Sequence, residues 1–246
     1  MARVALILGA GPNLGQSIAA KFAANGYRVA VAARRVSDGV SKETGFFGMK
    51  ANLSNPETVR EAFQTTTKEL GPPNVVVYNV AERFTTPPDD PLSAAMEQIE
   101  ASRKAGVDSA FVAAQEALKA FKTHPPGTPT AFIYTGNTLN QIAIPGVLPF
   151  ALAKVAAAML IEYCANAYGK DGYRFYYADQ RQPNGLPAGA DRDGLAHAEM
   201  YFELAHESKQ SKWLVTFVKS EGRRRFEGVA FDGETRASYD RKFGRE

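Results

Sequence analysis

Three glycines near the start of the chain have the spacing of a phosphate-binding turn. Gly9, Gly11 and Gly15 lie between an apolar segment, residues 4–8, and an alanine-rich segment, residues 16–25. In a strand–turn–helix unit, the first glycine permits a tight turn, the second lets the backbone approach a phosphate, and the third lets helix and strand pack closely. The unit also presents a helix N-terminus to the anion. The pattern predicts binding of a dinucleotide, the alternative being a tight turn without a ligand.

The next apolar segment, residues 28–33, ends in two arginines and no acid. An acid at this point would bind a ribose 2′-hydroxyl, whereas Arg34 and Arg35 follow Ala33 here. Guanidinium groups form charge-assisted hydrogen bonds with phosphate, so they favour the 2′-phosphate of NADP(H). We therefore expect both arginines to bind the cofactor, the alternative being loop arginines that face water.

Composition argues against several other kinds of site. A net charge of +3 is too small to indicate a nucleic-acid partner, and the basic residues 223–225 are interpreted as part of a solvated tail. The single cysteine, Cys164, excludes a disulfide framework and a cysteine metal site, and it fits a reducing, cytoplasmic compartment. The three histidines lack zinc-site spacing, and no apolar run is judged long enough to span a bilayer. We expect a small-molecule substrate, no metal, no nucleic acid and no membrane.

Alternating strand and helix patterns predict how the candidate residues are held together. Continuous apolar strands between helices indicate a parallel sheet covered on both faces. The expected strands are 4–8, 28–33, 46–51, 74–78, 130–135, 174–178 and 213–219. The expected helices are 15–25, 56–70, 91–106, 109–122, 149–168 and 195–208. Ligands of such sheets bind at the carboxyl ends of the strands.

The fold class that follows is α/β, a Rossmann-type doubly wound parallel sheet of about seven strands. We expect one NADP(H)-binding domain over residues 1–246. A polar stretch rich in glycine and proline, residues 180–194, begins a substrate-loop and helix region at about 180–210. An irregular tail is expected at about 222–246.

The motifs and their order resemble the short-chain dehydrogenase/reductase family, from Ala2 to about Lys219. The family's T-G-x-x-x-G-x-G corresponds to residues 8–15, its adenine-flanking pair to residues 52–53, its N-N-A-G to residues 78–81, and its Y-x-x-x-K to residues 150–154. The resemblance implies NADP(H) as cofactor. The cofactor-binding residues that it implies, together with the glycine and arginine positions above, are Gly9, Gly11, Asn13, Leu14, Gly15, Arg34, Arg35, Asn52, Leu53, Asn79, Val80 and Lys154.

The positions that carry the family's proton chemistry are largely replaced. The resemblance places Phe150 at the catalytic tyrosine, Asn137 at the serine and Gly106 at the asparagine, and it retains only Lys154, which binds the nicotinamide ribose in the family. Phenylalanine cannot donate a proton, and losing a general acid costs roughly 10²–10⁴-fold in rate. We expect Lys154 and Asn137 to be the catalytic residues of a rearranged site.

Three functions stay open for such a site. The favoured one is an NADPH-dependent oxidoreductase that reduces a C=O or C=N group. Asn137 would bind a carbonyl oxygen, and Tyr134, Thr138, a substrate hydroxyl or water would supply the proton. An iminium substrate needs no acid, and Asp179 could stabilise its charge. The alternatives are non-redox chemistry in the same cleft and a catalytically inactive NADP(H)-binding protein.

Two further expectations concern substrate and assembly. The substrate is expected to contact Asn137, Thr138, Phe150 and Asp179. The apolar helices at 109–122 and 149–168 resemble the family's interface helices, which implies a homodimer or homotetramer.

Overall fold

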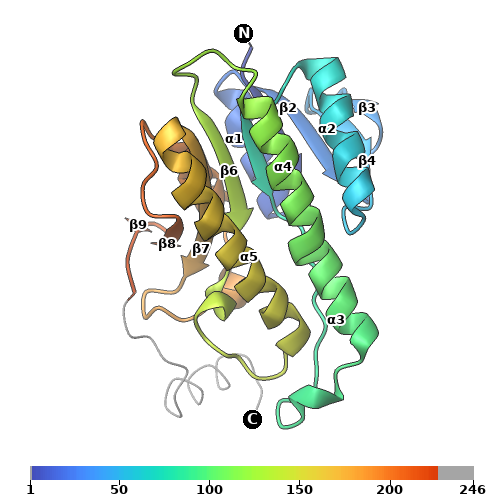
Figure 1. Cartoon of the computed structure of the whole chain (residues 1–246), viewed down its shortest axis with the longest axis vertical. Helices are drawn as coiled ribbons and strands as arrows, with labels where there is room; N and C mark the ends of the chain where they lie inside the picture. Colours follow the sequence, from blue (N-terminus) through green and yellow to red (C-terminus); the bar gives the residue numbers. More distant parts are fainter. Residues whose placement is uncertain (1, 227–246) are drawn as a thin grey trace.

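A nine-stranded sheet forms the centre of the computed structural model, which describes residues 2–226 (Figure 1). The strand order is β3-β4-β2-β1-β5-β6-β7-β8-β9. The strands are β1 Val4–Leu8, β2 Arg28–Ala33, β3 Gly39–Val40, β4 Phe47–Lys50, β5 Val75–Tyr78, β6 Thr130–Thr135, β7 Tyr173–Arg181, β8 Leu214–Val218 and β9 Gly222–Arg223. The strands from β4 to β8 are parallel, and the two edge strands are antiparallel. The doubly wound fold is confirmed, but the prediction of about seven strands was wrong because two-residue edge strands leave no periodic pattern in a sequence.

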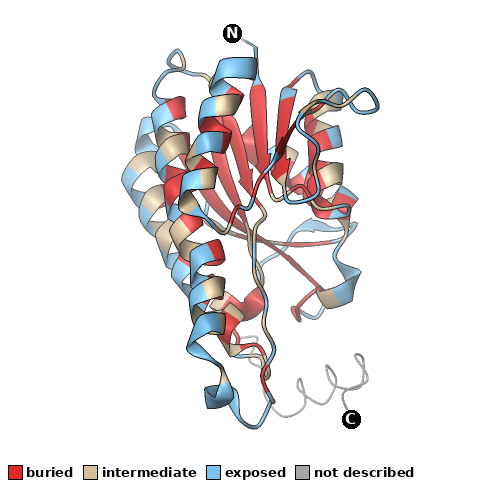
Figure 2. Ribbon diagram, turned by 90° about the vertical axis from the view of Figure 1, so that its right-hand side faces the viewer, coloured by how far each residue is buried: buried red, intermediate tan, exposed pale blue. Residues whose placement is uncertain are grey.

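Helices cover both faces of this sheet. They are α1 Leu14–Ala24, α2 Pro56–Leu70, α3 Met96–Arg103, α4 Ser109–Phe121, α5 Leu148–Tyr168 and α6 Gly194–Ala205. One apolar core joins the sheet to α2, α4 and α5, and a second joins the opposite face to α1 and α6. Figure 2 shows the consequence, with buried strands between helices whose outer sides are exposed. The arrangement leaves the strand ends, and the loops after them, free to form a site.

The helix before α4 differs from its predicted form. Pro91 begins a short 3₁₀ turn, Pro91–Ser93, and α3 starts only at Met96. A π-helical turn, Lys104–Asp108, then joins α3 to α4, so the two predicted helices form one continuous helical segment. Such turns widen a helix and leave backbone carbonyls open to other partners.

The substrate-loop region also begins later than predicted. β7 continues through Asp179 and Gln180 to Arg181, three residues beyond the expected end at residue 178. The backbone of each of these residues pairs with a residue of β8, and their polar side chains bond to one another and to neighbouring loops. Residues 222–223 of the predicted tail form β9, and residues 227–246 lie outside the described part of the chain.

The helix α5 agrees with its predicted bounds, starting one residue earlier, and is apolar over most of its length. The helical segment Leu148–Asp171 contains an 18-residue window with a mean hydropathy of 1.5, and it reaches the length that could cross a membrane. The expectation that no apolar run has this length was therefore wrong on length and composition alone. However, one face of the helix, including Ala157 and Ile161, packs in the core against the sheet, as in other helices of open α/β folds.

Candidate active site

The glycine turn has the geometry that a bound diphosphate needs. Gly9 has φ +93°, and a Cβ there would lie 2.4 Å from the backbone oxygen of Asn79. At Gly15 a Cβ would lie 2.5 Å from the Cα of Ala10, whereas Gly11 has no atom within 4 Å of that position. Gly9 and Gly15 are thus required by the turn and by packing. Gly11 faces open space, where a ligand can approach the backbone.

Asn79 and Asn13 fix the two sides of this turn. The side-chain amide of Asn79, which follows β5, donates to the oxygen of Gly9 at 2.9 Å, and Val80 comes directly after it. Asn13 precedes Leu14, the first residue of α1, and its Nδ2 donates to the oxygen of Arg192 at 3.0 Å. The residue that replaces a glycine of the family motif therefore ties the start of α6 to the phosphate turn.

The candidate adenosine residues lie at the ends of β2 and β4, which are adjacent strands. Arg34 and Arg35 are exposed, and Nη1 of Arg34 lies 3.1 Å from Oε1 of Glu82. Asn52 is exposed, and its Oδ1 accepts from the backbone of the turn that follows it. Leu53 is 4% exposed and packs in the core, which fixes the backbone of this loop.

Lys154 is almost fully buried at the carboxyl end of β6. Its Nζ donates to the oxygen of Thr135 at 2.8 Å and lies 3.5 Å from the hydroxyl of Tyr134. It also lies 4.5 Å from the Tyr134 ring centroid and 5.3 Å from that of Phe150. Burial lowers the pKa of Lys154 to about 7, although the charge of Asp179 opposes this shift. The Nζ of Lys154 therefore lies at the end of β6 and close to the ring of Phe150.

Asn137 is oriented by its own turn. It caps the 3₁₀ turn Thr138–Asn140, and its Oδ1 accepts from the backbone N–H of Leu139 at 3.1 Å. The hydroxyl of Tyr177 accepts from the backbone N–H of Asn137 and donates to its backbone oxygen, at 3.2 and 3.1 Å. Because the Oδ1 is occupied, the Nδ2 of Asn137 is the side-chain atom left for a ligand. The Oγ1 of the neighbouring Thr138 is buried without a hydrogen-bond partner in the part of the chain described.

Three tyrosines, of which the sequence predicted only Tyr134 as a possible proton donor, fill the space behind Lys154. Tyr78, Tyr134 and Tyr177 are in register on β5, β6 and β7, and their rings are stacked 5.5 Å apart. The hydroxyls of Tyr78 and Tyr134 donate to the oxygens of Ala105 and Gly106, at 2.5 and 3.0 Å, within the π-helical turn.

Gly106 is matched to this packing. A Cβ at Gly106 would lie 2.9 Å from the Cβ of Ala153 and 3.6 Å from the Tyr134 hydroxyl. An asparagine at this position therefore requires α5 or the helical turn to shift. Burial raises the pKa of Tyr134, so its hydroxyl is a weaker acid than a free tyrosine. The Tyr134 side chain occupies the space beside Gly106 and donates a hydrogen bond to its backbone oxygen, but its raised pKa makes it poorly suited to donate a proton.

Asp179 lies in β7 as half of a buried ion pair. Its carboxylate binds Nε of Arg181, and both side chains are nearly inaccessible to water. Arg181 also donates to Gly185 and to Oε1 of Gln141, at 3.0 and 2.8 Å. Burial raises the pKa of Asp179 to about 6 against the opposing effect of Arg181. This carboxylate is thus committed to a protein partner.

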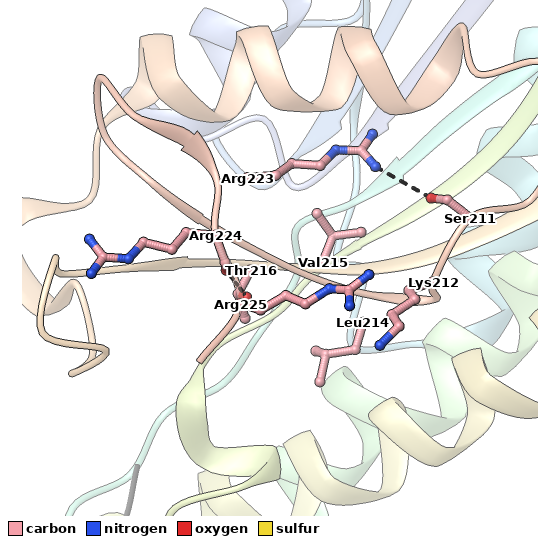
Figure 3. A pocket seen from close by; sticks show the side chains of 8 residues that line it. All are labelled: Ser211, Lys212, Leu214, Val215, Thr216, Arg223, Arg224 and Arg225. Carbon is pink, nitrogen blue, oxygen red and sulfur yellow. Dashed lines mark hydrogen bonds between the residues drawn. The ribbon is translucent and has the colours of Figure 1, made fainter. Parts of the chain in front are cut away.

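A separate hollow of about 240 Å³ lies on β8 and β9, at the outer edge of the sheet (Figure 3). Its lining includes Lys212, Arg223, Arg224 and Arg225. Carboxylates of α6 and of the β8–β9 turn pair with two of these arginines, so we assign the hollow no ligand. Within residues 2–226, no group of three or more acidic, histidine or cysteine side chains could hold a metal.

Comparisons with known proteins give one consistent result. A family model described as short chain dehydrogenase matches residues 3–177. The short chain dehydrogenase/reductase dmxR12 of Cryptosporiopsis sp. is 36% identical over 231 residues, which cover 89% of this chain and 93% of that protein. A short-chain dehydrogenase structure from Rhodopseudomonas palustris has a TM-score of 0.72 at 18% identity, covering 91% of this chain and 99% of that one. The structure of 4-hydroxyisoleucine dehydrogenase complexed with NADH has a TM-score of 0.62 at 16% identity, covering 73% and 75%.

Proposed function

The chain belongs to the short-chain dehydrogenase family, and from this premise we propose that it is an NADPH-dependent reductase of a small carbonyl compound. One observation carries the proposal. Lys154 and the free amide of Asn137 lie together at the carboxyl end of β6, although the tyrosine position holds Phe150. A chain that served only as a scaffold would have no need of a buried lysine at this end of the sheet, where its desolvation is unfavourable.

The orientation of Asn137 favours C=O over a protonated C=N group as the reacting centre. Its Oδ1 accepts from Leu139, whereas its Nδ2 has no hydrogen-bond partner among the described residues, so we expect the N–H donor to serve the ligand. A donor stabilises the negative charge that develops on a carbonyl oxygen, and it repels an iminium N–H. Asp179, the acceptor that an iminium would need, is bound to Arg181 instead. The geometry therefore supports a neutral carbonyl substrate.

The residues present fit a nicotinamide dinucleotide. The space beside Gly11 is open, so a diphosphate can approach the turn and the N-terminus of α1. Arg34 and Arg35 are exposed and lie where they can reach a 2′-phosphate, Arg34 from its ion pair with Glu82. Lys154 uses two of its three N–H donors on Thr135 and Tyr134, which leaves one for a ribose hydroxyl. When bound, NADPH supplies the hydride.

The proton must come from a group other than residue 150. Burial raises the pKa values of Tyr134 and Tyr177, which makes both weaker acids. Lys154, whose pKa is lowered to about 7, holds a proton that it can release near neutral pH. We propose that the Lys154 Nζ provides this proton through water.

The apolar outer face of α5 supports a homo-oligomer. Leu152, Val155, Met159 and Tyr163 recur at helical spacing and are each about half or more exposed, as is Phe111 on α4. Exposed apolar faces of this kind mark interaction sites. Light scattering at micromolar concentration is expected to give a dimer or a larger species, and a monomer would contradict this.

The test of function combines nucleotide binding with turnover. NADPH fluorescence is titrated first, and NADPH consumption is then measured with ketones, imines and enones. Asn137→Asp removes the N–H donor at constant size, so it should lower carbonyl turnover by roughly 10²-fold while leaving NADPH affinity within a factor of two. Asn137→Ser, which keeps a hydroxyl donor, should retain most activity.

Two outcomes would replace this proposal. Product formed without NADPH consumption would indicate non-redox chemistry. Tight NADPH binding without turnover of any carbonyl would indicate an inactive cofactor-binding protein.

A further inference from the structure

Glu82 forms an ion pair across the proposed cofactor cleft. Glu82 follows β5, and Arg34 follows β2, with Nη1 and Oε1 3.1 Å apart. β2 and β5 pair with opposite edges of β1. The ion pair therefore connects two loops that lie on either side of the strand leading into the glycine turn.

The acid is the better-anchored member of this pair. The backbone oxygen of Glu82 accepts from the hydroxyl of Ser102 at 3.0 Å, and Ser102 is 1% exposed in α3. The side chain of Glu82 is 30% exposed, whereas that of Arg34 is 70% exposed. Among the described residues, Glu82 is the one carboxylate paired with Arg34. Arg34 is thus the partner that can turn toward a ligand.

NADP(H) and NAD(H) would interact differently with the ion pair of Arg34 and Glu82. The 2′-phosphate of NADP(H) must take Arg34 from Glu82 and then bear a carboxylate close to its own charge. A ribose 2′-hydroxyl carries no charge and can donate to the carboxylate. No acid that could bind a ribose 2′-hydroxyl directly follows β2. Glu82, which follows β5, can take that role.

We infer that Glu82 sets the nucleotide selectivity of the site by opposing Arg34, and so weakens the binding of the 2′-phosphorylated cofactor. The inference rests on the proposed cofactor. It adds a residue outside the matched motifs, because neither the glycine turn nor the end of β2 contains this acid. The arrangement makes the NADPH preference conferred by Arg34 smaller than the arginines alone would give.

The experiment compares four proteins by equilibrium titration with NADPH and with NADH. These are the wild type, Glu82→Gln, Arg34→Gln, and the control Glu199→Gln, which removes a carboxylate paired with Lys21 between α1 and α6. At a separation of about 6 Å in a mostly aqueous environment, removing one charge near a dianion should tighten NADPH binding about tenfold. NADH binding should be unchanged or weaker, and the gain should shrink as salt is raised.

The outcomes distinguish the selectivity role of Glu82 from the proposed 2′-phosphate site. If Glu82→Gln changes both affinities equally, or neither, the selectivity role of Glu82 is wrong, whatever Arg34 does. If Arg34→Gln leaves NADPH affinity unchanged, the proposed 2′-phosphate site is wrong as well. If the wild type binds neither nucleotide, both the inference and the proposed cofactor fail. Glu199→Gln should match the wild type, because a response there would mean that net charge alone is being measured.

Discussion

Phe150→Tyr is expected to increase carbonyl reduction, because it restores an acid at the position where the family places one. The Lys154 Nζ lies 5.3 Å from the ring centroid of Phe150. At about this separation and an effective dielectric constant of roughly 20, an ammonium stabilises a phenolate by about 3 kcal/mol. That energy lowers a tyrosine pKa by about 2 units, from about 10 to about 8. A positioned acid of this strength should raise kcat by roughly 10²-fold or more.

The assay is the loss of NADPH absorbance with a panel of ketones. Phe150→Leu serves as the matched control, since it changes the ring without adding a hydroxyl. The gain should be largest below about pH 7, where Lys154 is charged, and it should decline as the pH rises and the ammonium is lost. The double variant Phe150→Tyr, Lys154→Met should lose most of the gain.

The reasoning is refuted if Phe150→Tyr binds NADPH as tightly as the wild type and still shows no increase with any ketone. That result would mean that residue 150 does not face the reacting centre. A gain of equal size at all pH values would also be informative, since it would show that Lys154 does not control the new phenol.

Four other substitutions test the geometry of the site. Gly9→Ala should lower the free energy of unfolding, measured by urea denaturation, by roughly 2–4 kcal/mol, because its Cβ would overlap a backbone oxygen 2.4 Å away. Gly11→Ala has no neighbour at the Cβ position, so it should keep the wild-type stability and lose NADPH affinity. Lys154→Met should raise the Tm and lower NADPH affinity. The Tm gain should be smaller at about pH 9 than at about pH 6, because a buried lysine with a pKa of about 7 destabilises the fold most where it stays charged. An equal gain at both pH values would contradict the lowered pKa. Arg181→Met leaves Asp179 buried without its partner and should lower the free energy of unfolding by roughly 3–5 kcal/mol at neutral pH. This loss of stability should become smaller at pH values under about 5, where the carboxyl is protonated. A loss that does not depend on pH would show that Asp179 stays neutral throughout.

The sequence by itself determined the order of most strands and helices and named the residues that we propose to bind the cofactor. Gly9 and Gly15 could be identified because each has a local requirement, the positive φ of the turn at Gly9 and the strand–helix contact with Ala10 at Gly15; the contact of Gly9 with Asn79 is long-range and was not visible in the sequence. The parallel sheet followed from continuous apolar strands, since that pattern also depends on neighbours in the chain. The replacement of a tyrosine by Phe150 was visible for the same reason.

Only the tertiary structure decided what surrounds these residues. Tyr78, Tyr134 and Tyr177 come from three strands, and only their shared register brings the rings into one stack beside Lys154. The prediction of a loop after residue 178 failed because the polar residues there extend β7 by pairing with β8, and Arg181 bonds to Gln141 forty residues away; a local pattern contains neither partner.

The same distinction applies to the charges at the cleft. Whether Asp179 faces a substrate or an arginine, and whether Arg34 stands alone or opposite Glu82, depends on side chains brought together by the fold. Electrostatic energies depend on separation in space and on burial, neither of which residue order specifies. The types and spacing of residues indicated which groups could bind a cofactor. The packing of the folded chain determined which of these groups remain free to do so.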